Sequence, residues 1–282
     1  MALKPFRSIG IGVAYSPNLK ANLFEAARLA VFFQSKLFLI HVGESSEDKT
    51  TMLKVILKSF EKEDLDYEVV FKTGNPVDVI LSTSEEKKID LLVLGAVQRE
   101  RFLKYYVGSI ARKITREAKC SVLLLIKPSV ERIACEHIVV NGLKDPKTEQ
   151  TIKTAFYVAK KLSSEKITIV EEIKQDQISV KVDDDKSLRR ANIIKERIRH
   201  RENARIKEII SHIPSTYTNN KTIKLQPIFG KKGYSIGHYA QISRADLLVM
   251  NAPSKMTFWD RLFPHDIEHI LTELPTDVLI LQ

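Results

Sequence analysis

Short apolar runs alternate with segments of helical apolar spacing along the whole chain. The runs 91–94 and 122–126 are continuously apolar, as in strands that are buried on both faces of a parallel sheet. Between such runs apolar residues recur every three or four positions, which is the period of an amphipathic helix. This order predicts a doubly wound α/β fold, because right-handed crossovers place helices on both faces of a parallel sheet. In the first half we expect strands at 8–15, 36–42, 66–72, 90–94 and 121–126, and helices at 22–33, 49–63, 76–87 and 109–118.

The second half of the chain repeats the first. Residues 74–126 and 230–282 match without a gap at an offset of 156, so Asp90 corresponds to Asp246. We therefore predict two tandem five-stranded parallel-sheet domains, residues 1–130 and 131–282. An exposed apolar edge strand favours association, so we expect strands 122–126 and 278–281 to face each other in an internal pseudo-dimer. The other predicted elements of the second half are strands 137–141, 167–172, 222–229 and 246–250, and helices 149–162, 186–207, 236–243 and 265–274.

A candidate ligand crevice follows from this topology. Doubly wound sheets bind ligands beyond the carboxyl ends of their strands, where the winding reverses, and Ala14, Val42 and Gly95 are expected there. Glycine lets a backbone approach a phosphate closely, and a helix N-terminus offers free N–H groups to it. The first copy is therefore predicted to accept a nucleotide through the pattern Gly95-x2-Gln98-x9-Gly108-Ser109. The second copy carries Asn251, Ser254, Pro264 and His265 at these positions, and we expect no nucleotide there.

The net charge of +10 is concentrated in one segment. Residues 186–207 hold nine basic side chains and two acidic ones, with helical apolar spacing and Asp183-Asp184-Asp185 before them, where acidic residues favour a helix start. The pattern predicts a long amphipathic helix with a solvated basic face. The alternative is a surface for an acidic partner, RNA or anionic lipid. No aromatic residue lies among the arginines, which disfavours single-strand stacking.

Several other classes of protein are disfavoured by the sequence. No apolar run approaches the roughly 18 residues of a membrane span, and the N-terminal segment has no signal-peptide core. The two cysteines, Cys120 and Cys135, are too few for a disulfide scaffold and fit a reducing compartment such as the cytoplasm. Phosphate-loop and nucleophile-elbow motifs are absent, so we expect no enzyme. The stretch 265–269 spells H-x-x-E-H, a zinc-type spacing. We interpret it as the polar first turn of a helix after Pro264 and expect no metal site.

These residues resemble the universal stress proteins in their tandem form. The resemblance rests on the strand 9–16, the run 37–42, Gly74-Asn75-Pro76, the strand end at Gly95 and the loop to Gly108-Ser109. It implies Rossmann-like domains of strand order 3-2-1-4-5 that pair through their last strands, and a stress-linked role. Some members of the family bind ATP, through G-x2-G-x9-G followed by Ser or Thr.

Two departures from the family bear on that ligand. Ala14 stands where the family has an aspartate, as Asn141 does in the second copy, and Gln98 stands where the family has the second glycine. We therefore expect a cytoplasmic, non-enzymatic stress-response protein that binds ATP, with its magnesium, weakly through the first domain. The alternative is a nucleotide-independent scaffold whose helix 186–207 docks an acidic partner. Further homodimerisation is left open, and no nucleic-acid partner is expected. The residues expected to contact the nucleotide are Ala14, Val42, Gly95, Gln98, Gly108, Ser109 and Ile110.

Overall fold

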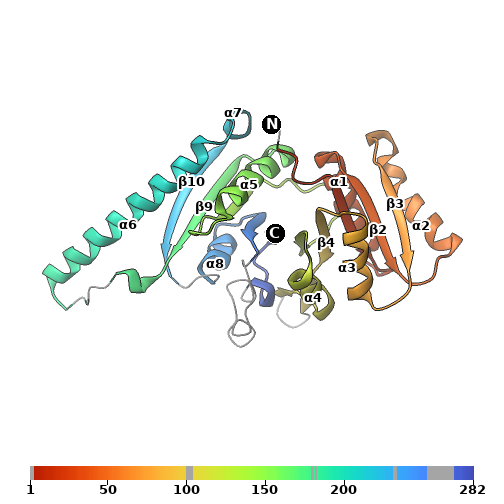
Figure 1. The fold of residues 1–282 in the computed structure, drawn as a ribbon, viewed down its shortest axis with the longest axis horizontal. Coiled ribbons are helices and arrows are strands. Elements are labelled where there is room, and N and C mark those ends of the chain that lie inside the picture. Colours follow the sequence, from red (N-terminus) through yellow and green to blue (C-terminus); the bar gives the residue numbers. More distant parts are fainter. Residues whose placement is uncertain (1–2, 100–103, 179–180, 182, 231–233, 253–269) are drawn as a thin grey trace. The chain divides into compact units, whose positions relative to one another are not determined.

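The chain forms two compact units, each with a parallel sheet covered by helices (Figure 1). Unit 1 comprises Met1–Ala134 and Leu271–Gln282, and unit 2 comprises Cys135–Ile270. The computed structural model describes residues 3–99, 104–178, 181, 183–230, 234–252 and 270–282.

Unit 1 begins with the predicted alternation of strands and helices. The winding reverses beside β1, because β2 and β4 pair with it on either side. Helices α1 and α2 pack together on one face, and α3 and α4 pack together on the other. The strands are β1 (Ser8–Val13), β2 (Lys36–Val42), β3 (Tyr67–Lys72), β4 (Leu91–Gly95), β5 (Val97–Arg99), β6 (Lys104–Tyr106) and β7 (Ser121–Leu125). The helices are α1 (Leu19–Phe33), α2 (Glu47–Leu57), the 3-10 helix η1 (Lys58–Glu63), α3 (Pro76–Glu86) and α4 (Ser109–Glu117).

Local sequence explains where two of these helices start. Ser46 caps α2 by accepting a hydrogen bond from the Lys49 backbone N–H, and the Asn75 side chain caps α3 through the Val77 N–H. Pro76 follows at the first helical position, where its fixed φ and missing N–H cost nothing. The segment predicted as one helix at 49–63 ends its α-helical part at Leu57 and continues as η1.

The strand order of unit 1 confirms the predicted fold class. The order β3-β2-β1-β4-β7 is the expected 3-2-1-4-5 arrangement, and these strands are parallel. A sixth strand, β12 (Asp277–Leu281), pairs with β7 in antiparallel orientation, with Leu279 opposite Leu123. The predicted pairing of 122–126 with 278–281 is therefore confirmed. The end of the chain belongs to unit 1, whereas the sequence had assigned it to the second domain.

Unit 2 repeats the same winding. Its sheet has the order β10-β9-β8-β11, with parallel pairs throughout. Helix α5 packs against α6 and α7, while α8 contacts β9 and β11. The strands are β8 (His137–Asn141), β9 (Lys166–Ile173), β10 (Thr222–Phe229) and β11 (Leu247–Asn251). The helices are α5 (Thr148–Leu162), the 3-10 helix η2 (Gln175–Gln177), α6 (Asp185–Ser211), α7 (Ser215–Thr218) and α8 (Tyr234–Ile242). The helix predicted at 265–274 lies largely outside the described residues, which resume at Ile270.

The repeated aspartates have a structural role that explains their place in the repeat. One Asp90 carboxylate oxygen accepts hydrogen bonds from the backbone N–H groups of Arg7 at 2.8 Å and Ser8 at 3.1 Å. One Asp246 oxygen accepts from Glu136 and His137, each at 2.9 Å. Each aspartate therefore fixes the start of the first strand of its unit, which makes Ser8 and His137 equivalent positions.

Candidate functional site

The carboxyl edge of the unit 1 sheet brings three of the predicted site residues to one side. Val13 pairs with His41 and Ile11 pairs with Val93, so β1, β2 and β4 end at neighbouring positions. Ala14 follows β1, Val42 ends β2 and Gly95 ends β4. This is the reversal point of the winding, where ligands of doubly wound sheets bind.

The predicted ligand loop between β4 and α4 contains a hairpin. Strands β5 and β6 form a two-stranded antiparallel sheet in which Gln98 pairs with Tyr105. The backbone of Gln98 is thus engaged in pairing, while its side chain and residues 100–103 lie outside what the structure describes. The sequence missed this hairpin, because three-residue strands leave too short an alternation to recognise.

Helix α4 begins with an open N-terminus. Its N-cap is Gly108, with φ −60° and ψ 163°, and no side chain caps the helix. Those angles are available to any residue, so conformation does not require a glycine there. Ser109 is exposed, and the Ile110 side chain is 48% exposed. The first turn of α4 therefore presents backbone N–H groups and the positive end of the helix dipole to an anion.

A small polar cluster lies at the end of β2. His41 is 9% exposed, and its Nδ1 lies 2.9 Å from the Val13 carbonyl oxygen, which can only accept. Nδ1 therefore carries the proton, and Nε2 accepts from the Lys49 ammonium at 3.3 Å. Lys49 also donates to the Glu44 carbonyl at 3.0 Å. Gly43 has φ +152°, and a Cβ there would lie 2.9 Å from His41 Nε2, so glycine is needed both for the turn and for the ring.

The end of β1 carries no carboxylate at Ala14. Ala14 is exposed and offers no polar side-chain group. A Cβ added at Gly95 would lie 3.5 Å from the Asn22 Oδ1, which is an ordinary van der Waals distance. That oxygen is buried and has no hydrogen-bond partner among the described groups. An amide oxygen from α1 thus lies close to Gly95. No sequence signal marked it, because Asn22 lies in a segment with a helical pattern.

The equivalent edge of unit 2 is filled by an ion-paired cluster. From the equivalence of Ser8 with His137, Glu171 takes the place of His41. Arg205 of α6 donates to the Glu171 carboxylate at 2.9 Å, to the Gly142 carbonyl at 2.5 Å and to Glu202 at 3.0 Å. Gly142 corresponds to Val13, so the carbonyl that His41 uses in unit 1 is used by an arginine in unit 2.

Glu171 is an unusual acid. Its side chain is 3% exposed, and its Oε2 has no hydrogen-bond partner among the described residues. Burial raises the pKa of Glu171 to about 7; Arg205 opposes this rise and neighbouring Glu202 adds to it. The sequence did not single out Glu171 or Arg205, because a strand residue and one arginine among many carry no distinctive motif.

The structure corrects one sequence alignment between the copies. Asn141 was aligned with Ala14, but the strand registers make it equivalent to Gly12, two positions earlier. The Asn141 side chain is 3% exposed and accepts a hydrogen bond from the Leu143 N–H, so it shapes the turn after β8. Of the degenerate second loop, Asn251 ends β11, while Ser254, Pro264 and the H-x-x-E-H stretch at 265–269 lie outside the described residues.

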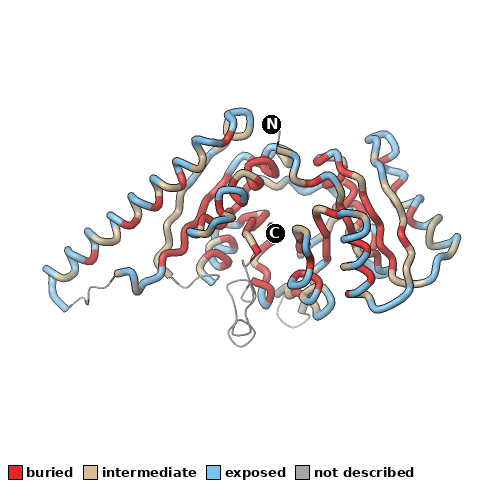
Figure 2. The backbone as a smooth tube through the Cα atoms, viewed as in Figure 1, coloured by how far each residue is buried: buried red, intermediate tan, exposed pale blue. Residues whose placement is uncertain are grey.

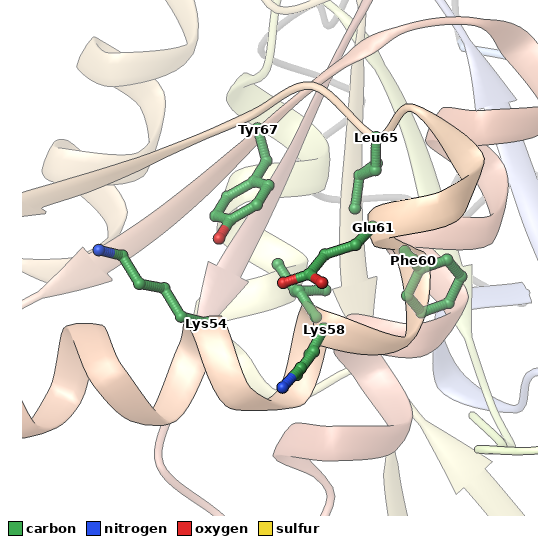
Figure 3. Close-up of a pocket in the computed structure, with 7 residues that line it drawn as sticks. Lys54, Lys58, Phe60, Glu61, Leu65 and Tyr67 are labelled. Carbon is green, nitrogen blue, oxygen red and sulfur yellow. The ribbon is translucent and has the colours of Figure 1, made fainter.

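The described cavity of unit 1 lies away from the predicted site. Figure 3 shows it between α2, η1 and Tyr67, which begins β3 at the amino edge of the sheet. Its volume of about 150 Å³ is below the 300 Å³ or more typical of ligand pockets. Lys54, Lys58 and Glu61 line its polar side, and Leu57, Phe60 and Leu65 line its apolar side. This cavity is too small for a nucleotide.

Other sites of chemistry are sparse in the described part of the chain. No cluster of three or more His, Cys, Asp or Glu side chains suited to a metal is found among the described residues. Burial raises the pKa of Cys120 to about 11, so it is a protonated thiol near neutral pH. Where the structure describes helices, none combines the length and apolar composition needed to cross a bilayer.

Comparisons with known proteins agree with this geometry. The model of the universal stress protein family matches residues 5–125. A universal stress protein of Methanocaldococcus jannaschii is 29% identical over 85 residues, which are 30% of this chain and 50% of that protein. The match thus spans half the length of that relative.

Solved structures share the fold over the full chain. A universal stress protein of Archaeoglobus fulgidus superposes with a TM-score of 0.70 at 15% identity, covering 100% of this chain and 99% of its own. A protein of Pseudomonas aeruginosa gives a TM-score of 0.71 at 16% identity, covering 98% and 92%. At such identities the likeness concerns the fold alone. Residues 5–125, which contain the reversal point beside β1 and the glycine-capped helix α4, thus match the universal stress protein family, and the whole chain shares the fold of a solved universal stress protein.

Proposed function

We propose that unit 1 binds an adenine nucleotide and that the protein is a non-enzymatic, nucleotide-responsive stress protein of the cytoplasm. The observation that carries the proposal is the open N-terminus of α4. Gly108 occupies an N-cap position where Ser, Thr, Asp or Asn would normally satisfy an N–H group, and its φ does not require glycine. A residue without a side chain at this place leaves room and donors for a phosphate.

The proposed contacts follow the predicted site. Phosphates lie on the N–H groups of Ser109 and Ile110, and the nucleotide extends past Gly95 and Gln98 toward Ala14 and Val42 at the ends of the strands. Magnesium is proposed to bind only together with the triphosphate, as the ion that the nucleotide carries. In the same proposal residues 1–130 and 131–282 descend from two copies of one domain, forming an internal pseudo-dimer.

Binding in unit 1 is expected to be weak, and unit 2 is expected to bind no nucleotide. Without a carboxylate at Ala14, the ligand loses a charge-assisted hydrogen bond of about 1.5 to 3 kcal/mol, or roughly ten- to a hundredfold in affinity. In unit 2 the Arg205 side chain already donates hydrogen bonds to the Gly142 carbonyl and the Glu171 carboxylate. A ligand there would have to displace a buried ion pair.

Isothermal titration with ATP and magnesium tests the proposal. Gly108→Asp is expected to weaken binding at least about tenfold, because its carboxylate would accept from the α4 N–H groups and repel the phosphates. Asn75→Asp is the matched control, since it places the same charge at the N-cap of α3 and should leave affinity unchanged. Absence of binding heat with the unaltered protein at high concentration would refute the nucleotide site.

Ala14→Asp is expected to strengthen ATP binding by about tenfold or more. The change restores the family's carboxylate at the end of β1, where it can accept a hydrogen bond from the ribose or base. Competition between ATP and a fluorescent ATP analogue would measure the gain. An unchanged affinity would mean that the nucleotide does not extend toward Ala14, even if Gly108→Asp abolishes binding.

A further inference from the structure

The basic residues of α6 form two groups with different surroundings. The members of one group are engaged: Arg205 pairs with Glu171 and Glu202, and Arg201 also pairs with Glu202. Arg199 pairs with Glu196, and Lys195 and Arg199 lie over the Phe229 ring. A second group is exposed and forms no ion pair with any described carboxylate. This outer group consists of Lys186, Arg189, Arg190, Arg197 and Lys207.

The outer group lies on one face of the helix. Lys186, Arg190, Ile193 and Arg197 recur at spacings of four, three and four residues, which keeps them in one row on a helix of 3.6 residues per turn. We name this row the outer stripe. At 1.5 Å per residue it extends over about 17 Å. The buried positions of α6 fall on the opposite face, and Figure 2 shows them recurring between exposed stretches along the helix. They are Ala191, Ile198, Glu202 and Ile206.

The outer stripe is mixed in character. Ile193, between Arg190 and Arg197, is 54% exposed. Lys186 and Arg190, four residues apart, repel each other, which destabilises an isolated helix slightly. Neither side chain forms an ion pair with a described carboxylate of unit 2. Carboxylates supplied by a partner would relieve this repulsion.

We propose that the outer stripe of α6 docks an acidic polypeptide segment that carries an apolar side chain between its carboxylates. Arginine guanidinium groups bind carboxylates in a two-pronged geometry, and the positive row would also speed the encounter with an acidic chain. Ile193 would cover the apolar side chain of the partner, which adds specificity to the charge attraction.

Two other polyanions fit the stripe less well. A lipid surface is held by a broad apolar face on an amphipathic helix, whereas Ile193 is the single apolar member of the outer stripe. A nucleic acid presents phosphates and bases, and Asp185–Ser211 contains no Phe, Tyr or Trp on which a base could stack. An exposed isoleucine would have no counterpart along a phosphate backbone.

Fluorescence anisotropy with a labelled glutamate-rich peptide containing one central leucine tests this proposal. At about 0.15 M salt, Arg190→Glu with Arg197→Glu is expected to weaken binding at least about tenfold. Lys54→Glu on α2 with Lys58→Glu on η1 changes the net charge equally and is expected to change affinity less than about twofold. Ile193→Ser is expected to weaken the leucine peptide about threefold and to leave an all-glutamate peptide unaffected.

Three results would overturn the proposal. In the first, the unaltered protein fails to bind the peptide. In the second, the two double variants lose affinity equally. In the third, a single-stranded RNA or phosphatidylserine vesicles bind more tightly than the peptide, with the same dependence on Arg190 and Arg197. Circular dichroism would verify folding. If charge reversal prevents folding, Arg190→Gln with Arg197→Gln replaces it, with the same expected direction.

Discussion

A chain that ends at Thr276 is expected to lose the stable fold of unit 1. The missing strand β12 pairs with β7, and its residues Val278, Leu279, Ile280 and Leu281 are between 0% and 7% exposed. Burying each such side chain contributes about 1.5 to 3 kcal/mol. Four of them together approach the total stability of about 5 to 15 kcal/mol that a domain possesses.

Urea unfolding and size-exclusion chromatography would measure the effect. The truncated chain is expected to unfold at much lower urea and to aggregate, because the freed edge of β7 is apolar and unpaired. A chain ending at Leu281 is the matched control; it lacks only the hydrogen bond from Gln282 to the Ala118 carbonyl and should remain stable. Leu279→Ala is expected to cost about 2 to 5 kcal/mol. An unchanged unfolding transition after truncation would show that β12 is dispensable for unit 1.

Replacing Arg205 by alanine is expected to destabilise unit 2 by about 3 kcal/mol at pH 8. The substitution leaves Glu171 buried without a cation and removes the donor to the Gly142 carbonyl. Arg199→Ala is the matched control, because Arg199 pairs with a half-exposed Glu196 and should contribute about 0 to 1 kcal/mol.

The loss should be smaller at pH 5.5 than at pH 8. Burial raises the pKa of Glu171 to about 7, above the pKa of about 4.3 for an unperturbed glutamate. Between the two pKa values, Glu171 therefore keeps its proton in the native state and has lost it in the unfolded state. The stability linked to this proton is fully present below about pH 4 and is lost as the pH rises through about 7. At pH 5.5 Glu171 is mostly protonated, so its need for Arg205 is reduced.

Urea unfolding of the single variants and of the double variant Arg205→Ala with Glu171→Gln would separate these contributions. Glutamine removes the buried charge, so the double variant is expected to recover most of the stability lost at pH 8 and to be less sensitive to pH. If Arg205→Ala cost the same at both pH values, Glu171 would not be the group that Arg205 stabilises.

Much of the fold could be predicted because the signals are local. The strands His137–Asn141 and Thr222–Phe229 were predicted with their observed ends. The first is buried throughout, as its short apolar run predicts, whereas the second lies at the edge of its sheet and has no fully buried residue. The amphipathic period likewise predicted α6, which is longer by one residue at its start and four at its end. The capping signals at Asn75 and Pro76 marked the start of α3.

The candidate site could be predicted only in part. Ala14, Val42 and Gly95 follow from strand ends, and Gly108 from the start of a helix, so chain order placed them. The strands of the hairpin at Gln98 are too short to recognise from their pattern. The His41 contact with the Val13 carbonyl and the unpartnered oxygen of Asn22 near Gly95 depend on residues distant in sequence. Such contacts leave no periodic pattern in the sequence.

The sequence by itself determined that the chain is a repeat of an α/β unit, because burial period and glycine spacing are properties of neighbouring residues. Tertiary structure alone decided that the last strand belongs to the first unit and that Arg205 fills the edge of the second. Both outcomes depend on free energies of burial and ion pairing between segments more than 30 residues apart. The physical reason is that a strand has the same apolar pattern whichever edge it joins, and an arginine has the same charge whether it faces a buried acid or water.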